Sequence, residues 1–204
     1  MPVVLPSRWK QLFLAAIKAV VNGSIDDVRL FVEQGVSVYA KDGFGKTLLF
    51  HAVENHSDIN VMKYLVENGA DVNASTRDGW TPLFEASYDS SIEIVKFLVD
   101  CGADPNKKTR EGMTPLHHAG SNTNIDVMKY LIEKGADINA INGFGWTPLD
   151  DVHYKEQVAI LREAGGKTGD EIFEIIEKIR MRPKKKMRFH RRNPNSFFRD
   201  ISNF

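Results

Sequence analysis

Two short motifs recur along this chain at one common period, and this doubled repeat restricts the fold more than any other feature of the sequence. The first motif begins at threonines spaced 34, 33 and 33 residues apart: Thr47, Thr81, Thr114 and Thr147. The second begins at glycines with the same spacings: Gly35, Gly69, Gly102 and Gly135. A unit of this length cannot bury its apolar face alone, so two motifs in phase indicate a stack of similar units.

Each unit has the pattern of two short helices. The threonine suits a helix N-cap, because its hydroxyl accepts a hydrogen bond from a free backbone N–H. Pro82, Pro115 and Pro148 follow at the first helical position, where no N–H is needed. In the fourth unit a first helix is predicted near 116–121, and a second carries the apolar stripe Ile125, Val127, Met128, Leu131 and Ile132. The glycine ends the second helix, and a hairpin-like loop is predicted before the next threonine.

The chain resembles the ankyrin-repeat family in these motifs, which read Thr-Pro-Leu-His at 114–117 and Gly-Ala-Asp-x-Asn at 69–73, 102–106 and 135–139. The resemblance covers about residues 7–168 and implies an all-α solenoid of about five helix-turn-helix repeats with hairpin-like loops. Only the fourth repeat has the complete Thr-Pro-Leu-His motif, the first repeat lacks it, and the fifth is about three residues short in its helices. Atypical end repeats are expected where a stack is capped.

The repeats set the predicted domain boundaries. The stack is expected over 1–168, with repeats near 7–40, 41–74, 75–107, 108–140 and 141–168, and with first-repeat helices near 7–21 and 25–33. Thr168 and Glu171 fit a capping box at the start of a C-terminal capping helix over 169–181. We expect this helix to seal the stack with its apolar stripe, which consists of Ile172, Phe173, Ile175, Ile176 and Ile179. Residues 182–204 form a basic aromatic tail.

The resemblance implies that a partner binds the concave face, at the loop tips and the ends of the first helices. The candidate residues at these positions are Phe44, Lys46, Arg77, Asp78, Trp80, Tyr88, Arg110, Glu111, Met113, Phe144, Trp146 and Tyr154. Six of them are aromatic where the repeat framework needs no large ring, which favours a groove for a protein or peptide. The alternative is local packing between neighbouring loop tips. A binding surface predicts that Trp80 and Trp146 are exposed and that Trp9 is more buried.

The charges of this chain are divided unequally along the sequence. Residues 1–177 hold 17 Lys/Arg and 26 Asp/Glu, a net charge of −9, whereas 178–204 hold ten Lys/Arg and one acid, a net charge of +9. The basic candidates of the tail are Lys184, Lys185, Lys186, Arg188, Arg191 and Arg192. Three interpretations remain open: binding of nucleic acid or an acidic partner, a nuclear-import signal, or packing of the tail on its own acidic repeats.

No residue pattern indicates catalysis, and we expect no metal and no cofactor. The adjacent His117 and His118 point in different directions on a helix, and the single cysteine, Cys101, has no base at a recognisable spacing. The glycine-rich segment 165–169 lacks the spacer of a phosphate loop and is predicted to end a helix. No apolar run reaches the ~18 residues of a membrane span.

The sequence therefore predicts a non-enzymatic, monomeric module that binds an unidentified protein or peptide. Nucleic-acid or acidic-partner binding through the tail is the alternative function, with the repeats as scaffold. We expect a cytoplasmic protein, or a nuclear one if the chain is eukaryotic or is delivered to a eukaryotic host.

Overall fold

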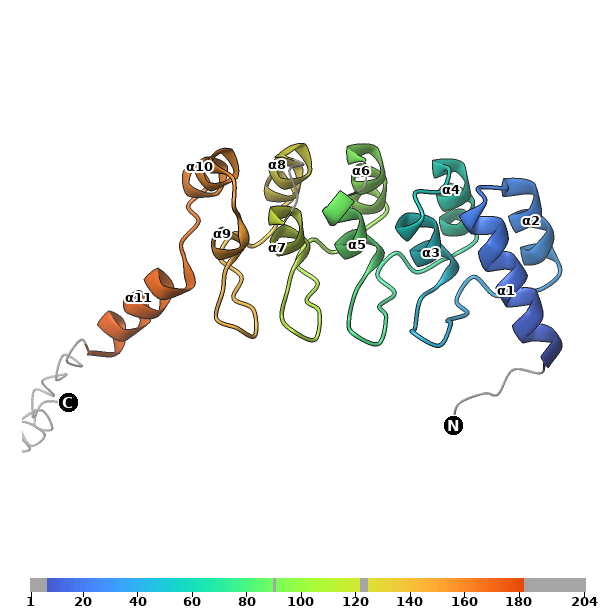
Figure 1. Ribbon diagram of the computed structural model, residues 1–204, viewed down its shortest axis with the longest axis horizontal. Helices are drawn as coiled ribbons and strands as arrows, with labels where there is room; N and C mark the ends of the chain where they lie inside the picture. The colour runs from blue at the N-terminus through green and yellow to red at the C-terminus, as the bar shows by residue number, and fades with distance from the viewer. Residues whose placement is uncertain (1–6, 90, 122–124, 182–204) are drawn as a thin grey trace, which may run out of the picture. The chain divides into compact units, whose positions relative to one another are not determined.

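The computed structural model describes residues 7–89, 91–121 and 125–181, and these residues form eleven helices joined by loops, with no strand (Figure 1). The helices are α1 Ser7–Val21, α2 Ile25–Glu33, α3 Leu48–Glu54, α4 Ile59–Glu67, α5 Pro82–Asp89, α6 Ile92–Asp100, α7 Pro115–Gly120, α8 Ile125–Glu133, α9 Pro148–Asp151, α10 Lys155–Glu163 and α11 Gly169–Met181. The predicted all-α repeat fold is confirmed. Contacts divide the chain into two units, 1–172 and 173–204.

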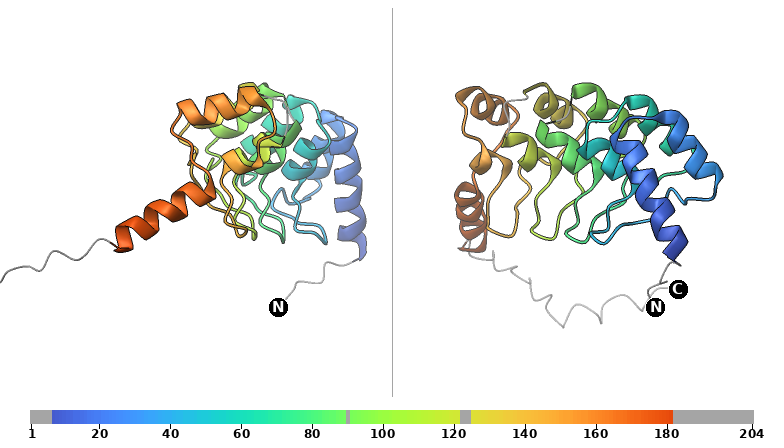
Figure 2. Two further views of the ribbon diagram at one scale, coloured as in Figure 1. Left: turned by 60° about the vertical axis from the view of Figure 1, so that its left-hand side comes forward. Right: turned by 45° about the vertical axis from the view of Figure 1, so that its right-hand side comes forward.

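The ten helices α1 to α10 form five consecutive pairs. Each first helix packs against the first helices of the neighbouring repeats, in the order α1, α3, α5, α7 and α9 (Figure 1). The second helices form another row, and the loops that connect the repeats project from the side of the first row (Figure 2). Leucines from both rows fill the space between them without solvent exposure: Leu49, Leu83 and Leu116 from the first helices, and Leu65, Leu98 and Leu131 from the second.

The helix ends follow the chemistry predicted for them. The hydroxyls of Thr47 and Thr81 accept hydrogen bonds from the backbone N–H of Phe50 at 3.2 Å and Phe84 at 3.1 Å. Glycines in the left-handed region end the second helices, as at Gly102, where φ is 91°. The first helix of the fourth repeat begins at Pro115 rather than Leu116, because proline itself occupies the first helical position.

The loops between the repeats, which we call finger loops, cover 34–47, 68–81, 101–114 and 134–147. Adjacent tips are joined by backbone hydrogen bonds from Arg77 N to Phe44 O and from Arg110 N to Asp78 O, both 2.9 Å long. A Cβ atom on Gly79 would lie 3.0 Å from the Arg110 nitrogen, so this close approach requires glycine. The finger loops therefore support one another as a continuous edge of the stack.

The two ends of the described chain, at Trp9 and at α11, differ in part from the sequence-based expectation. Trp9 was expected to be more buried than Trp80 and Trp146: its exposed fraction of 40% is below the 52% of Trp146 but not below the 38% of Trp80. Trp9 lies in the first turn of α1 and packs near Gly35, and no repeat precedes it among the described residues. Helix α11 has the expected bounds, but its role as a seal stays a prediction, because the apolar side chains Phe173, Ile175, Ile176 and Ile179 are exposed.

Candidate protein-binding surface

The candidate surface consists of the exposed sides of α3, α5, α7 and α9 together with the finger loops, and we call it the first-helix face. Five of the six aromatic candidates lie on it, and all six are exposed: Phe44, Trp80, Tyr88, Phe144, Trp146 and Tyr154. Tyr154 was expected late in a first helix, but α9 already ends at Asp151 and Tyr154 is the N-cap residue of α10. The exposed fraction is highest at the loop tips, at 72% for Phe44 and 64% for Phe144, and lowest for Trp80. The predicted exposure of Trp80 and Trp146 is thus confirmed, and packing between the loops does not bury either ring.

In two finger loops the same hydrogen-bond pattern holds the turn that carries the exposed rings. In the finger of repeat 2, one carboxylate oxygen of Asp42 accepts from the N–H groups of Phe44 and Lys46, at 2.8 and 2.9 Å. In the finger of repeat 5, the amide oxygen of Asn142 accepts from Phe144 and Trp146, at 2.9 and 3.0 Å. Burial opposes the charge of Asp42, but these N–H groups and the neighbouring His51 outweigh it and lower its pKa. The exposed rings are therefore carried by rigid turns.

An aromatic cluster joins repeats 3 and 4 on this face. The rings of Phe84 and His118 stack with their centroids 4.2 Å apart. The ring of Tyr88 also stacks with His118, at 5.0 Å between centroids, and the Trp80 ring lies 5.1 Å from the Phe84 ring. The Nδ1–H of His118 donates to the Phe84 carbonyl at 2.8 Å, which anchors the imidazole ring. Sequence reasoning missed Phe84 and His118 as parts of this surface. The spacing of Phe84 and Tyr88, four residues apart on one helix, was a usable signal.

A charged network occupies the corresponding part of repeat 2. The ammonium group of Lys46 pairs with Glu54 and lies 5.3 Å from the centre of the Phe50 ring. His51 lies between two carboxylates, 3.1 Å from Asp42 and 3.6 Å from Glu54. Lys46 is consequently drawn over the first-helix face and is only partly exposed.

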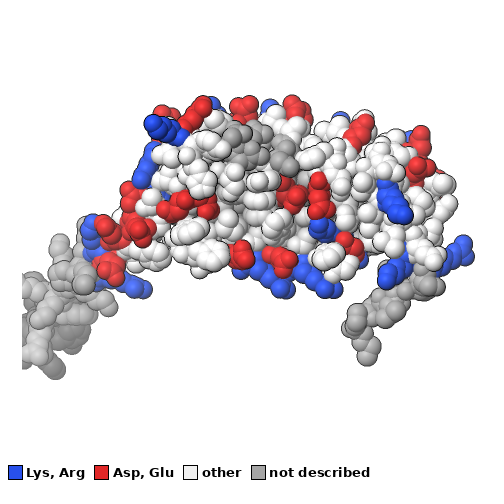
Figure 3. All heavy atoms as spheres, viewed as in Figure 1, with Lys and Arg blue, Asp and Glu red and all other residues white. Residues whose placement is uncertain are grey.

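The remaining candidates divide by position. Arg77, Asp78, Arg110 and Glu111 are exposed at the finger tips, where Lys and Arg alternate with acids along the loop edge (Figure 3). Met113 is only partly exposed, because its sulfur accepts a hydrogen bond from the buried amide of Asn142 at 3.0 Å. Met113 therefore contributes to the packing of neighbouring fingers. The tail candidates Lys184, Lys185, Lys186, Arg188, Arg191 and Arg192 lie outside the described residues.

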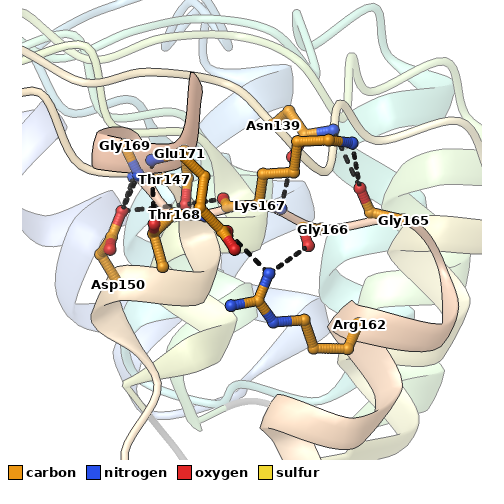
Figure 4. Close-up of polar contacts among 10 residues, drawn as sticks. All are labelled: Asn139, Thr147, Asp150, Arg162, Gly165, Gly166, Lys167, Thr168, Gly169 and Glu171. Carbon is orange, nitrogen blue, oxygen red and sulfur yellow. Dashed lines mark hydrogen bonds and ion pairs between the residues drawn. The ribbon is translucent and has the colours of Figure 1, made fainter. Parts of the chain in front are cut away.

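The glycine-rich segment 165–169 ends one helix and starts the next (Figure 4). Gly165 is left-handed with φ of 92°, and Gly166 N donates to Leu161 O at 2.7 Å. Thr168 and Glu171 form the predicted capping box: Thr168 N donates to the Glu171 carboxylate at 2.7 Å, and Glu171 N donates to the Thr168 hydroxyl at 3.2 Å. The backbone of this segment is thus engaged in helix termination and capping.

In repeats 4 and 5, the fourth residue of the threonine motif forms a hydrogen bond to the element that follows its repeat. Nδ1 of His117 accepts from the N–H of Thr114 at 3.2 Å, so Nε2–H donates to the carbonyl of Trp146 in the next finger, at 3.2 Å. In repeat 5 this position is Asp150, whose carboxylate accepts from Gly169 N at 2.8 Å (Figure 4). A carboxylate suits this place because Gly169 starts α11, where free N–H groups favour negative charge.

The cysteine, the clustering of acids and histidines, and the helix lengths bear on other kinds of function. Burial and the charge of Asp100 raise the pKa of Cys101, which disfavours the reactive thiolate. Among residues 7–89, 91–121 and 125–181, no three His, Cys, Asp or Glu side chains gather as metal ligands. No helix of those same segments is long and apolar enough to cross a membrane.

Comparison with known proteins identifies the repeats. A sequence profile of three ankyrin repeats matches residues 12–109, and a profile of multiple ankyrin repeats matches 98–150. The chain is 47% identical over 45 residues to an ankyrin repeat protein of fowlpox virus, an alignment that covers 22% of this chain and 9% of the viral protein. It is 42% identical over 64 residues to an ankyrin repeat-containing protein of Schizosaccharomyces pombe, covering 31% of this chain and 30% of the yeast protein.

The chain therefore aligns with less than a third of the length of either relative. The two profiles together cover residues 12–150 without a gap, a range that includes helices α2 to α8 and all four glycine and threonine motifs. This chain belongs to the ankyrin-repeat family.

Proposed function

We propose that this chain binds a partner protein through the first-helix face, with the exposed aromatic rings as the main contacts. Ankyrin repeats are generally protein–protein interaction modules and the family is typically non-enzymatic. The observation that carries the proposal is that all six aromatic candidates are exposed, five of them on the first helices and finger loops of repeats 2, 3 and 5 and Tyr154 at the start of α10. Trp and Tyr side chains of this kind supply a large part of the binding energy in protein interfaces.

The rigidity of the rings supports the same proposal. The turns at Asp42 and Asn142 fix the backbone on which Phe44, Phe144 and Trp146 stand. The anchored His118 ring holds Tyr88 in the aromatic cluster. A side chain that is ordered before binding loses less conformational entropy when a partner docks, so more of the contact energy appears as affinity.

The tail was the alternative site of function, for nucleic acid or an acidic partner. Its basic residues lie outside the described part of the chain. No observation of this structure favours that alternative, so the first-helix face is the single proposal.

Affinity capture with the full chain as bait tests this proposal. The baits are the unchanged chain, a Trp80→Ala and Trp146→Ala double variant, and a Trp9→Ala control that removes an exposed tryptophan outside the first-helix face. We expect quantitative mass spectrometry to show at least one captured protein that the double variant loses and the Trp9→Ala control retains. Equal capture by all three baits would falsify the proposal.

A further inference from the structure

A pocket of about 260 Å³ lies between repeats 2 and 3 on the first-helix face. Three aromatic rings line it: Phe44 from a finger tip, the buried Phe50 from α3, and Trp80 from the residue before the Thr81 cap of α5. This volume is below the ~300–1,000 Å³ of small-molecule sites, so the pocket has the size for one side chain rather than for a whole metabolite.

The charged residues of the pocket select the chemistry of that side chain. Three carboxylates line it, from Glu54, Asp78 and Glu85, against one ammonium group, that of Lys46. The charges of these described lining residues therefore sum to −2. An aromatic face attracts a cation through its quadrupole, and carboxylates add direct charge attraction.

The protein already places a cation of its own beside this pocket. The Lys46 ammonium pairs with Glu54 and lies 5.3 Å from the centre of the Phe50 ring, whereas Asp78 and Glu85 line the pocket from repeat 3. An incoming apolar group would take these carboxylates out of water and offer them no opposite charge, and an incoming acid would be repelled. A cationic side chain avoids both costs.

We propose that this pocket receives a lysine or arginine side chain from an extended segment of the partner protein. The inference rests on the proposed function, because the pocket opens on the surface assigned to the partner. It adds the chemistry of the partner: the segment that crosses repeats 2 and 3 is basic. The ring of Trp80 contacts the incoming stem, and Asp78 and Glu85 receive its charge.

The chain contains three tryptophans, so its indole N–H signals in a nuclear magnetic resonance spectrum test this inference within one molecule. The probes are short capped glycine peptides with lysine, arginine, norleucine or glutamate at the centre, titrated to millimolar concentration into the full chain. We expect lysine and arginine to shift the Trp80 signal in a saturable way, while the Trp9 and Trp146 signals stay in place. Norleucine and glutamate should leave all three signals unchanged.

Charge-neutral variants supply the matched controls. Asp78→Asn with Glu85→Gln should weaken the lysine peptide by about tenfold, because two charges next to the ammonium are lost. Glu67→Gln with Glu133→Gln, which neutralises two exposed acids of the second helices, should leave the affinity unchanged. Lys46→Gln should tighten binding, since it removes the competing cation. Retained Trp9 and Trp146 signals show that each variant is folded.

Several results would overturn the inference. They are equal shifts with norleucine, equal shifts at Trp146, or no shift at Trp80 with either cationic peptide. Binding that appears only after Lys184→Gln, Lys185→Gln and Lys186→Gln would identify the chain's own tail as the occupant and so reject an external segment. If a captured partner is lost with Trp146→Ala but kept with Asp78→Asn and Glu85→Gln, the proposed function stands and the pocket assignment falls.

Discussion

Repeats 2 and 3 and repeats 4 and 5 use the fourth residue of the threonine motif in different ways. In repeats 2 and 3 it is phenylalanine, and the nearly inaccessible rings of Phe50 and Phe84 form the base of the first-helix face. In repeats 4 and 5 it is His117 or Asp150, which hydrogen-bonds to the next finger or to the start of α11. The helix and its threonine cap are shared, so one position decides whether a repeat builds an aromatic surface or a polar link.

This comparison predicts its largest effect at Phe50. Phe50→Ala should lower the free energy of unfolding by about 3–5 kcal/mol, because it removes a ring that is 1% exposed from the base of the face. Phe44→Ala, at the exposed tip above it, should cost less than about 0.5 kcal/mol. Urea unfolding followed by circular dichroism measures both, and similar losses for the two variants would refute the distinction between base and tip.

His117 should give the next largest effect, and it should depend on pH. His117→Ala should cost about 1–3 kcal/mol at neutral pH, since it leaves the Trp146 carbonyl and the Thr114 N–H without their partner. Burial lowers the pKa of His117 below 6.5, so the unfolded chain binds the proton more readily.

The stability that His117 provides should therefore be complete above pH 6.5 and should be lost as the pH falls below that value. The expected slope is at most about 1.4 kcal/mol per pH unit. His117→Phe, which places the residue of repeats 2 and 3 in repeat 4, should remove this part of the pH dependence. Unfolding midpoints of both chains, measured at about pH 7.5, 6 and 5, resolve a slope of this size. Parallel pH profiles of the two chains would count against the polar link.

Asp150 should contribute about 1 kcal/mol to the free energy of unfolding, because its loss removes a helix cap. Asp150→Ala removes the acceptor of Gly169 N and of Thr147 N, each at 2.8 Å. Hydrogen exchange should show faster exchange at the start of α11, and Asp170→Ala, an exposed acid in the same first turn, serves as control. Unchanged exchange at Gly169 would remove the linking role assigned to Asp150.

Replacement of the adjacent Asp151 should change the free energy of unfolding least, and it should stabilise the protein rather than destabilise it. Burial and then the charge of Asp150 raise the pKa of Asp151 to about 6, and its Oδ2 atom has no hydrogen-bond donor among the described residues. The folded state thus prefers the protonated acid, and stability declines as the pH rises from 3.8 towards 6. Asp151→Asn should therefore stabilise the protein at pH 7 by no more than about 1 kcal/mol, after allowance for partial exposure, and should have no effect near pH 3. A destabilised variant at pH 7 would show that the charge has an unseen partner.

The sequence predicted what depends on neighbours within one repeat. Threonine caps, prolines and glycines gave the helix pairs, because each signal acts over a few residues. The contacts between repeats were not predictable in this way. His118 stacks on Phe84, which lies 34 residues earlier. The repeat period places these residues in neighbouring repeats, but no local signal predicts that their rings stack. That Trp9 is no less exposed than Trp80 was not predicted for the same reason, since its exposure depends on what packs beside the first repeat.

The candidate surface was predictable as a set of positions but not as chemistry. The repeat period placed Trp80 and Phe44 on one face, whereas the pairing of Lys46 with Glu54 required the three-dimensional approach of a finger to the end of α3. Because of that pairing, Lys46 is a partly exposed residue that lines the pocket, whereas the sequence suggested an exposed cation that binds the partner.

The measurement that tests the central claim most directly compares stability with binding in the Trp80→Ala and Trp146→Ala double variant. If these rings bind the partner, the affinity for the captured protein should fall by more than about 2 kcal/mol. The free energy of unfolding should change much less than in Leu116→Ala, a fully buried core change expected to cost about 2–5 kcal/mol. Unfolding of the double variant would instead make the two tryptophans structural and contradict the account, as would undiminished partner affinity in a folded double variant.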